Sequence, residues 1–306
     1  MEPHGVMFHH FCEHRHTDSL GAITAERLEK IILSYSPGRI LPALEWYERA
    51  LVGKLEESDV CITFDDSLRS QVEIALPILR KHDITAFWFI YSSIFEDKGN
   101  VFELFRQFYN NYFTTFGEFF SVFLTHLSKV LSSLDLEVQR KKFSETDYLR
   151  EFKFYSDSER EYRYFRDRVL GREKFTSLMN SILASYGVTH KELSKYLWMV
   201  NDDLKELSDQ QHIIGLHSYS HPTEFCSLTY QQQLMEYQLN ARHIQRVTGK
   251  SPKTMAHPVN SYNAETLNIL ATIGVEVGFR ANMQQLVRSQ LEYPREDCVD
   301  IEIKKE

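Results

Sequence analysis

The sequence has few cysteines, no long apolar run and no cluster of basic residues. Its four cysteines are widely scattered and form no CxxC pair, which argues against a disulfide framework and against a zinc knuckle. The longest apolar run, at residues 84–91, has the length of a strand and falls far short of a membrane span. The formal net charge is −8, and no basic run offsets it. This charge disfavours a nucleic-acid partner, because phosphate binding needs a basic surface.

What the chain does contain is typical of a globular protein, with 42% apolar and 25% charged residues in a total of 306. This length suits two domains, or one α/β barrel that carries an insertion. The sequence begins Met-Glu-Pro-His-Gly, which has neither the basic nor the apolar part of a secretory leader. Together with the scattered cysteines, these features predict a cytoplasmic protein without a membrane span.

Apolar runs of strand length alternate with helical patterns at both ends of the chain. A strand at 60–64, a helix at 70–82 and a strand at 84–91 form a predicted parallel βαβ unit. The alternation resumes after residue 212, where Thr229 and Gln232 are placed as a capping box at the start of a long helix, which Gly249 ends as a C-cap. Further elements are predicted at 5–11, 24–34, 212–216, 228–248, 254–257, 263–273 and 275–279.

Between these two α/β segments the composition changes. Fourteen of the 21 phenylalanines lie within residues 95–175, a stretch without proline. We therefore predict an α/β domain made of residues 1–94 and 201–306, with a helical insertion at 95–200. The mixed charges of residues 159–174 predict a solvated face.

Aromatic residues of the insertion recur at three- and four-residue steps, as on one face of a helix. The stripe consists of Phe102, Phe105, Tyr109, Phe113, Phe116, Phe120 and Phe123. This spacing favours helix faces buried in a core. A groove for a lipid tail or for a second copy of the chain is the alternative.

Two adjacent carboxylates, Asp65 and Asp66, follow the strand predicted at 60–64. The carboxyl ends of parallel strands face the crevice in which α/β proteins bind ligands. Carboxylates this close repel each other, so they imply a bound cation or a shared proton. The alternative is that Asp66 or Ser67 caps the helix that follows.

His217 and His221 follow the strand predicted at 212–216. Two histidines four residues apart lie on one side of a turn or a helix and can bind one metal ion. With Asp66 they would bind a divalent ion on one face and leave positions open for water and substrate. A structural role is the alternative, because the chain has 13 histidines and chance pairs are expected.

Four more histidines cluster near the N-terminus, namely His9, His10, His14 and His16. His9 and His10 lie in the run predicted as the first strand, so His9 would face the same crevice as the carboxylates. A surface position or a second metal site is the alternative for this cluster.

Three runs of the sequence resemble motifs of the polysaccharide deacetylases, the NodB-homology family. The run Cys-Ile-Thr-Phe-Asp-Asp-Ser-Leu-Arg-Ser at 61–70, with the residues 75–89 after it, resembles the family's first motif. The run Ile-Gly-Leu-His-Ser-Tyr-Ser-His at 214–221 resembles its histidine motif, and Ala-His-Pro-Val-Asn-Ser-Tyr at 256–262 resembles its third motif. The motifs occur in the family's order, and the helical insertion lies outside the resemblance.

The resemblance implies a fold and a set of roles. The fold is a distorted, incomplete (β/α) barrel of the NodB-homology type, here with a large helical insertion. The activity is that of a divalent-metal deacetylase of acetylated sugars, with Asp65 as general base. Asp66, His217 and His221 would bind the metal, which we expect to be zinc, with cobalt, nickel or manganese as alternatives.

The third motif would line the substrate. The backbone N–H of Val259, after Pro258, would lie where the family places an oxyanion donor. Tyr262 and His10 are further candidates for substrate contact. His257 is either a substrate contact or a packing residue.

The chain departs from the family at three positions. Ser67 replaces the glycine of the first motif, and Ala256 replaces the arginine that braces the base. No histidine follows His257 to serve as the family's C-terminal general acid. One branch of the family resembles a circular permutation with that histidine in an N-terminal Met-Tyr-His motif, and Met7-Phe8-His9 is similar to it. We therefore expect His9 to be the general acid, with His10 as the alternative.

The expected function is removal of an acetyl group from an N-acetylated sugar by a metal-activated water. A sugar nucleotide, a lipid-linked sugar or another glycan precursor would suit a cytoplasmic enzyme. Two alternatives remain open: a carbohydrate-binding or scaffold protein with a decayed site, and a hydrolase of another C–N bond, such as a formamide or a cyclic amide. Homo-oligomer formation through the insertion also remains open.

Overall fold

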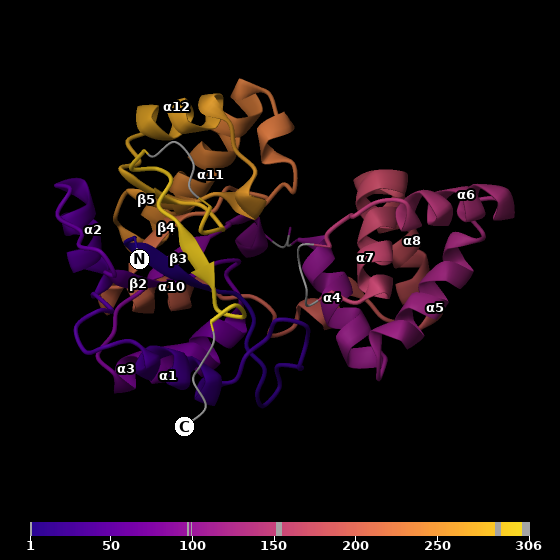
Figure 1. Cartoon of the computed structure of the whole chain (residues 1–306), viewed down its shortest axis with the longest axis horizontal. Coiled ribbons are helices and arrows are strands. Elements are labelled where there is room, and N and C mark those ends of the chain that lie inside the picture. The colour runs from indigo at the N-terminus through magenta and orange to yellow at the C-terminus, as the bar shows by residue number, and fades with distance from the viewer. Residues whose placement is uncertain (1, 97, 99, 151–154, 285–288, 302–306) are drawn as a thin grey trace. The chain divides into compact units, whose positions relative to one another are not determined.

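The computed structural model describes residues 2–96, 98, 100–150, 155–284 and 289–301. The chain divides into two compact units (Figure 1). The barrel unit comprises Met1–His16, Ala22–Asn100 and Tyr196–Glu306, and the helical unit comprises Thr17–Gly21 and Val101–Lys195. The sequence predicted divisions at 94/95 and 200/201, and it placed residues 17–21 in the barrel unit.

The barrel unit contains a seven-stranded sheet in the order β6-β5-β4-β3-β2-β1-β7, and every paired neighbour is parallel. The strands are β1 (His4–Phe8), β2 (Val60–Phe64), β3 (Phe87–Ile90), β4 (Ile213–Leu216), β5 (Thr254–Ala256), β6 (Val277–Phe279) and β7 (Arg295–Asp297). A parallel bridge between Phe279 and Tyr293 links β6 to the chain just before β7, so the sheet is a nearly closed barrel. The predicted (β/α) barrel is confirmed, although β7 was not predicted.

Helices from both α/β segments of the chain cover the barrel. They are α1 (Ala25–Ser34), α2 (Ala43–Leu51), α3 (Leu76–Lys81), α10 (Asn201–Asp209), α11 (Tyr230–Thr248) and α12 (Ala264–Thr272). Thr229 caps α11 in a capping box with Gln232, and Gly249 ends it with a φ of 74°, as predicted. The sequence missed α2, and the helix predicted at 70–82 contains a π-helical turn at Gln71–Ala75 before α3.

The two faces of the strands enter two apolar clusters, because successive side chains of a strand point to opposite faces. Trp88 and Ile90 pack in the larger cluster, with residues of the covering helices. Phe87 and Phe89 pack in the smaller cluster, which also holds Phe279. All four are at most 1% exposed, so β3 is buried on both faces, as is typical of a parallel sheet.

The helical unit is built from α4 (Val101–Tyr112), α5 (Phe116–Leu127), α6 (Ser133–Ser144), α7 (Asp157–Tyr164), α8 (Gly171–Ser185) and α9 (His190–Ser194). The aromatic stripe is divided between α4 and α5, because Thr115 begins a new helix with its own capping box. The Tyr162 ring lies 4.9 Å from that of Phe123 and 5.5 Å from that of Phe175. The interpretation of the stripe as a core is therefore confirmed, with Phe105 and Phe123 at most 1% exposed.

The prediction of a solvated face at 159–174 is wrong for its first turns. Glu161 and Arg163, on α7, are only 7% and 9% exposed. Each has a partner that makes burial tolerable, because Arg140 donates to Glu161 (2.7 Å) and the Arg163 guanidinium lies 3.9 Å from the Tyr155 ring centre. The positions of charged residues in the sequence do not show which of these side chains will be buried against a partner.

Candidate active site

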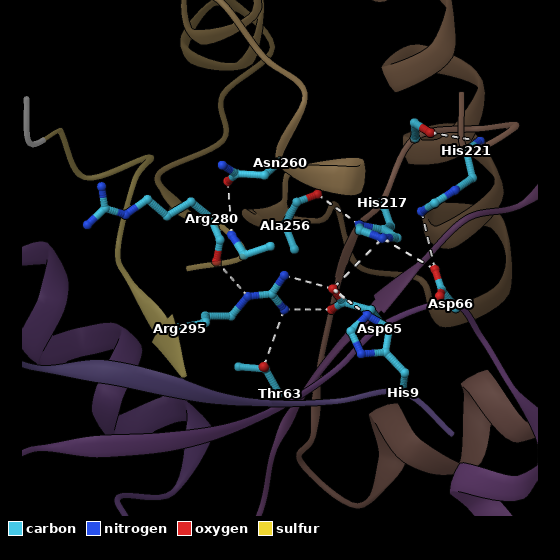
Figure 2. Close-up of polar contacts among 12 residues, drawn as sticks. His9, Thr63, Asp65, Asp66, His217, His221, Ala256, Asn260, Arg280 and Arg295 are labelled. Atoms are coloured by element: carbon cyan, nitrogen blue, oxygen red, sulfur yellow. Dashed lines mark hydrogen bonds and ion pairs between the residues drawn. The ribbon is translucent and has the colours of Figure 1, made fainter. Parts of the chain in front are cut away.

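The predicted catalytic and metal-binding residues lie at or just beyond the carboxyl ends of three strands, β1, β2 and β4. His9 follows β1, Asp65 and Asp66 follow β2, and His217 follows β4. Because the strands are parallel, these ends share one rim of the barrel. Figure 2 shows their side chains turned toward one another around Asp65.

Asp66, His217 and His221 form the candidate metal-binding group. Asp66 Oδ1 lies 3.5 Å from His217 Nε2 and 3.3 Å from His221 Nε2 (Figure 2). One donor atom from each of the three residues lies within 4.8 Å of the other two. Burial would raise the pKa of the Asp66 carboxyl, but the nearby imidazoles outweigh it and lower the pKa well below its usual range. A carboxylate and two imidazoles so arranged fit one divalent cation.

The orientation of His217 supports this assignment. Its Nδ1 lies 2.9 Å from the Ala256 carbonyl oxygen, to which it donates when it carries the proton. This hydrogen bond orients the ring so that Nε2 faces Asp66 and the position of the ion, the arrangement typical of histidine ligands of metals. The backbone N–H of His217 donates to Asn240 Oδ1 at 3.0 Å.

The loops that carry the group have an unusual backbone. Asp66, Ser67, Ser218 and His221 have φ values of 74°, 57°, 66° and 53°. Residues other than glycine adopt this left-handed region at a cost of about 1–3 kcal/mol, and such residues concentrate at functional sites. The two histidines therefore lie on a turn. The N-cap alternative for Asp66 or Ser67 is wrong, because Ser70 occupies the N-cap position of the helix that follows. The Ser67 hydroxyl instead donates to the Tyr91 carbonyl (3.4 Å).

Asp65 is paired with Arg295 of β7, a residue that the sequence analysis did not single out. Arg295 Nη1 and Nη2 lie 2.7 Å from Asp65 Oδ1 and Oδ2, and both side chains are buried. Burial would raise the pKa of the Asp65 carboxyl, but Arg295, His217 and His9 outweigh it and lower the pKa. Asp65 is therefore ionised at neutral pH.

Arg295 takes the place of the arginine that the family has at position 256. The resemblance implied that an arginine bracing the base was lost at position 256. In the structure β7 supplies a buried arginine to Asp65 from another part of the chain, and Ala256 contributes its carbonyl to His217. Arg295 is held in turn by the Arg280 carbonyl oxygen, to which its Nε donates at 2.9 Å.

His9 lies beside Asp65, with 3.8 Å between Nε2 and Oδ2. Its side chain is 30% exposed, so it can meet a ligand. The Gln71 side-chain amide donates to the backbone oxygens of both His9 (2.8 Å) and Asp65 (2.5 Å) and so ties the two strand ends together. The ring of His10 is centred 6.3 Å from that of His9. His16 lies 2.8 Å from Glu73 Oε2, which gives it a structural partner.

The third-motif segment follows β5. His257 is fully buried and stacks on Tyr262 with 3.9 Å between ring centres. Burial lowers the pKa of His257 to about 3, so it is neutral and donates through Nε2 to the Leu291 carbonyl (2.9 Å). Of its two interpretations, the structure supports the packing residue.

Pro258 is buried, whereas Val259 is 55% exposed and has a φ of 51°. A β-branched residue in the left-handed region is strained, so Val259 is a strained and exposed residue of the turn that follows β5. Tyr262 donates its hydroxyl to Glu292 Oε1 at 2.9 Å, so that hydroxyl already has a protein partner.

Known proteins resemble this chain in sequence and in fold. Residues 175–278 match the family described as polysaccharide deacetylase, a stretch that includes His217, His221 and the third motif. Among curated proteins, none matches the chain in sequence.

Solved structures show the same fold over nearly the whole chain. A Streptococcus pyogenes deacetylase, PplD, in complex with acetate has a TM-score of 0.55 at 14% identity, over 97% of this chain and 92% of that one. A de-N-acetylase from Aggregatibacter actinomycetemcomitans has a TM-score of 0.54 at 11% identity, over 97% and 95%. IcaB from Ammonifex degensii has a TM-score of 0.53 at 14% identity, over 96% and 90%.

These findings confirm the resemblance to the polysaccharide deacetylases, in sequence over residues 175–278 and in fold over nearly the whole chain. The circularly permuted branch is not tested by them and stays a prediction. In the part of the chain that the structure describes, every helix is too short or too polar to cross a bilayer.

Proposed function

Because the chain has the fold of the polysaccharide deacetylases and matches that family over residues 175–278, we propose that it is a metal-dependent deacetylase of N-acetylated sugars. The observation that carries the proposal is the convergence of Asp66, His217 and His221 beside an ionised Asp65. The Streptococcus pyogenes neighbour binds acetate, the product that this reaction would release. Sugar nucleotides, lipid-linked sugars and other N-acetylated glycan precursors are the substrates that we propose.

Asp66, His217 and His221 would hold the metal, and their donor atoms suit zinc as well as cobalt, nickel or manganese. A divalent ion bound by these residues would supply Lewis-acid chemistry, by activating a water and polarising the acyl carbonyl. The protein's part is to present one carboxylate and two imidazoles in a preorganised group, with His217 buried and Asp66 and His221 partly exposed. The hydrogen bond from His217 Nδ1 to the Ala256 carbonyl oxygen fixes the orientation of the His217 ring.

The remaining residues would move protons. Asp65 stays ionised because of Arg295, so it can accept the proton of the attacking water. Protonated His9 would donate to the departing amine, which is a very poor leaving group as an anion. The His9 imidazole lies 3.8 Å from the Asp65 carboxylate, at the rim that holds the other candidate residues. The Val259 N–H is our candidate for stabilising the oxyanion.

The alternative of a decayed site drew its support from Ala256 and from the missing C-terminal histidine. Arg295 occupies the bracing role at Asp65, and His9 lies within 3.8 Å of the same carboxylate. Both observations favour an active enzyme over a scaffold on the same fold.

The proposal is tested by metal analysis together with acetate release from N-acetylated sugars and sugar nucleotides. We expect about one divalent ion per chain, loss of acetate release after chelation and recovery when zinc or cobalt is returned. Bound metal with no acetate release from any substrate would favour the scaffold. Release of formate or opening of a cyclic amide would favour the other C–N hydrolase. Protein that binds no metal would contradict the proposal.

The assignment of the general acid is tested by His9→Gln. Glutamine keeps a polar side chain but cannot supply the proton, so we expect kcat/KM to fall about 10²-fold or more. His10→Gln is the matched control, and little change is expected. The reverse outcome, a large loss for His10→Gln and none for His9→Gln, would move the acid role to His10.

A further inference from the structure

The two imidazoles of the candidate metal group are joined by a spacer of three residues that is not helical. Ser218 and His221 both have positive φ values, 66° and 53°. Each such residue costs about 1–3 kcal/mol unless its surroundings hold it in place. The direction of His221 relative to His217 therefore depends on contacts that hold this spacer.

One carboxylate, that of Glu236 on α11, makes three of those contacts. Its Oε2 accepts hydrogen bonds from the backbone N–H groups of Tyr219 (3.0 Å) and Ser220 (2.8 Å). Its Oε1 accepts from the Ser220 hydroxyl at 2.8 Å. Hydrogen bonds to a charged acceptor are about twice as strong as neutral ones, so this carboxylate is a strong clamp.

The spacer is held from the opposite side as well. The Tyr219 carbonyl oxygen accepts from the N–H groups of Ser92 (3.1 Å) and Ser93 (2.8 Å), which follow β3. One turn along α11 from Glu236, Asn240 accepts from the His217 N–H (3.0 Å) and donates to the Ile90 carbonyl (2.9 Å). Residues four apart lie on the same face of a helix, so one face of α11 holds both His217 and the spacer.

We propose that Glu236 is a positioning residue for the metal site: it holds the spacer in the conformation that turns His217 and His221 toward one ion. This inference rests on the proposed function, since it assigns Glu236 a role in metal binding. Glu236 does not touch the donor atoms. Its effect passes through the backbone of Tyr219 and Ser220, and removing it would leave their N–H groups without this acceptor and allow His221 to turn away.

Zinc affinity and the visible spectrum of the Co²⁺ form test the proposal, because neither depends on turnover. We expect Glu236→Ala to weaken zinc binding about 10- to 100-fold, the range found when outer partners of metal ligands are removed, and to change the Co²⁺ spectrum. Glu236→Gln should restore most of the affinity, because its amide oxygen can accept from both backbone N–H groups. Gln238→Ala, at an exposed position of the same helix, is the control and should bind zinc as the wild type does.

Each outcome is decisive. Wild-type affinity and an unchanged Co²⁺ spectrum in folded Glu236→Ala would overturn the proposal. If Glu236→Ala does not fold, Ser220→Ala decides, since it removes only the hydroxyl contact; we expect severalfold weaker zinc binding, and no change would overturn the proposal. If the wild-type protein binds neither zinc nor cobalt, the proposed function fails before Glu236 is tested.

Discussion

Replacing Asp65 by asparagine is expected to lower acetate release about 10²- to 10⁴-fold while leaving about one metal ion bound per chain. Asparagine cannot accept the proton of the attacking water, whereas the candidate metal group does not include residue 65. Metal analysis and acetate release on the same preparation check both halves of this expectation. Thermal unfolding is measured alongside, because Arg295 loses the buried carboxylate charge of Asp65 in this variant.

His217→Ala is the contrasting variant. It removes a donor atom of the metal group, so metal and activity are expected to disappear together. Asp209→Asn, at an exposed position of α10, is the control for a lost carboxylate and should change neither. If Asp65→Asn also lost its metal, Asp65 would be a ligand and the division of labour between Asp65 and Asp66 would be wrong.

Arg295→Gln is expected to have the second large effect, on both activity and stability. Without the guanidinium, burial dominates and the pKa of Asp65 rises, so the acid limb of the kcat/KM profile should move up by about 1–3 pH units. Removing one partner of a buried ion pair typically costs about 3–5 kcal/mol of unfolding free energy. Arg242→Gln, at an exposed position of α11, is the control and should leave both quantities unchanged.

The pH dependence of that stability loss has a definite sign. In the wild type the pKa of Asp65 is lower folded than unfolded, so its stabilising contribution is present above the unfolded pKa, about 3.9, and is lost as pH falls through the folded one. In Arg295→Gln we expect burial to raise the folded pKa of Asp65 above the unfolded one, so that the contribution becomes destabilising as pH rises. The difference in unfolding free energy should therefore be largest near neutral pH and shrink toward pH 4. A difference independent of pH would show that Arg295 acts through packing alone.

The residues that the sequence placed correctly are close to one another in short motifs. Asp65-Asp66 and His217 to His221 each follow an apolar strand, and the rule that parallel strands share a carboxyl edge was enough to predict that they meet. Strand ends are local features, so a single sequence reveals them. What the residues do there is a separate question, and their catalytic and metal-binding roles stay predictions.

Arg295 could not be found in this way because its partner lies 230 residues earlier in the chain. β7 has three residues, all charged, and does not have the apolar pattern of a buried strand. A signal does exist at Gly5, where a Cβ would lie 2.9 Å from Thr63 and 3.1 Å from Arg295. Glycine at position 5 makes room for the arginine, but a sequence alone does not show which side chain needs the room.

Helix α11 likewise has features that the local sequence predicts and features that depend on packing. Thr229, Gln232 and Gly249 mark the ends of α11 by local hydrogen bonding, and their prediction is confirmed. The contacts of Glu236 and Asn240 on the same helix depend on where α11 packs against the histidine loop. Periodicity gives the face of a helix and not the loop that it will meet, so this part of the site appears only in three dimensions.

The pairing of Asp65 with Arg295 also sets an order of events during synthesis. A ribosome makes β2 and its carboxylates long before it makes β7, and the helical unit is made in between. Until β7 arrives, Asp65 has no guanidinium and burying its charge is unfavourable. The nascent barrel should therefore stay open at this edge, with the carboxylate in water, and close when Arg295 emerges. Synthesis of β7, closure of the barrel and readiness of the base would then be one event.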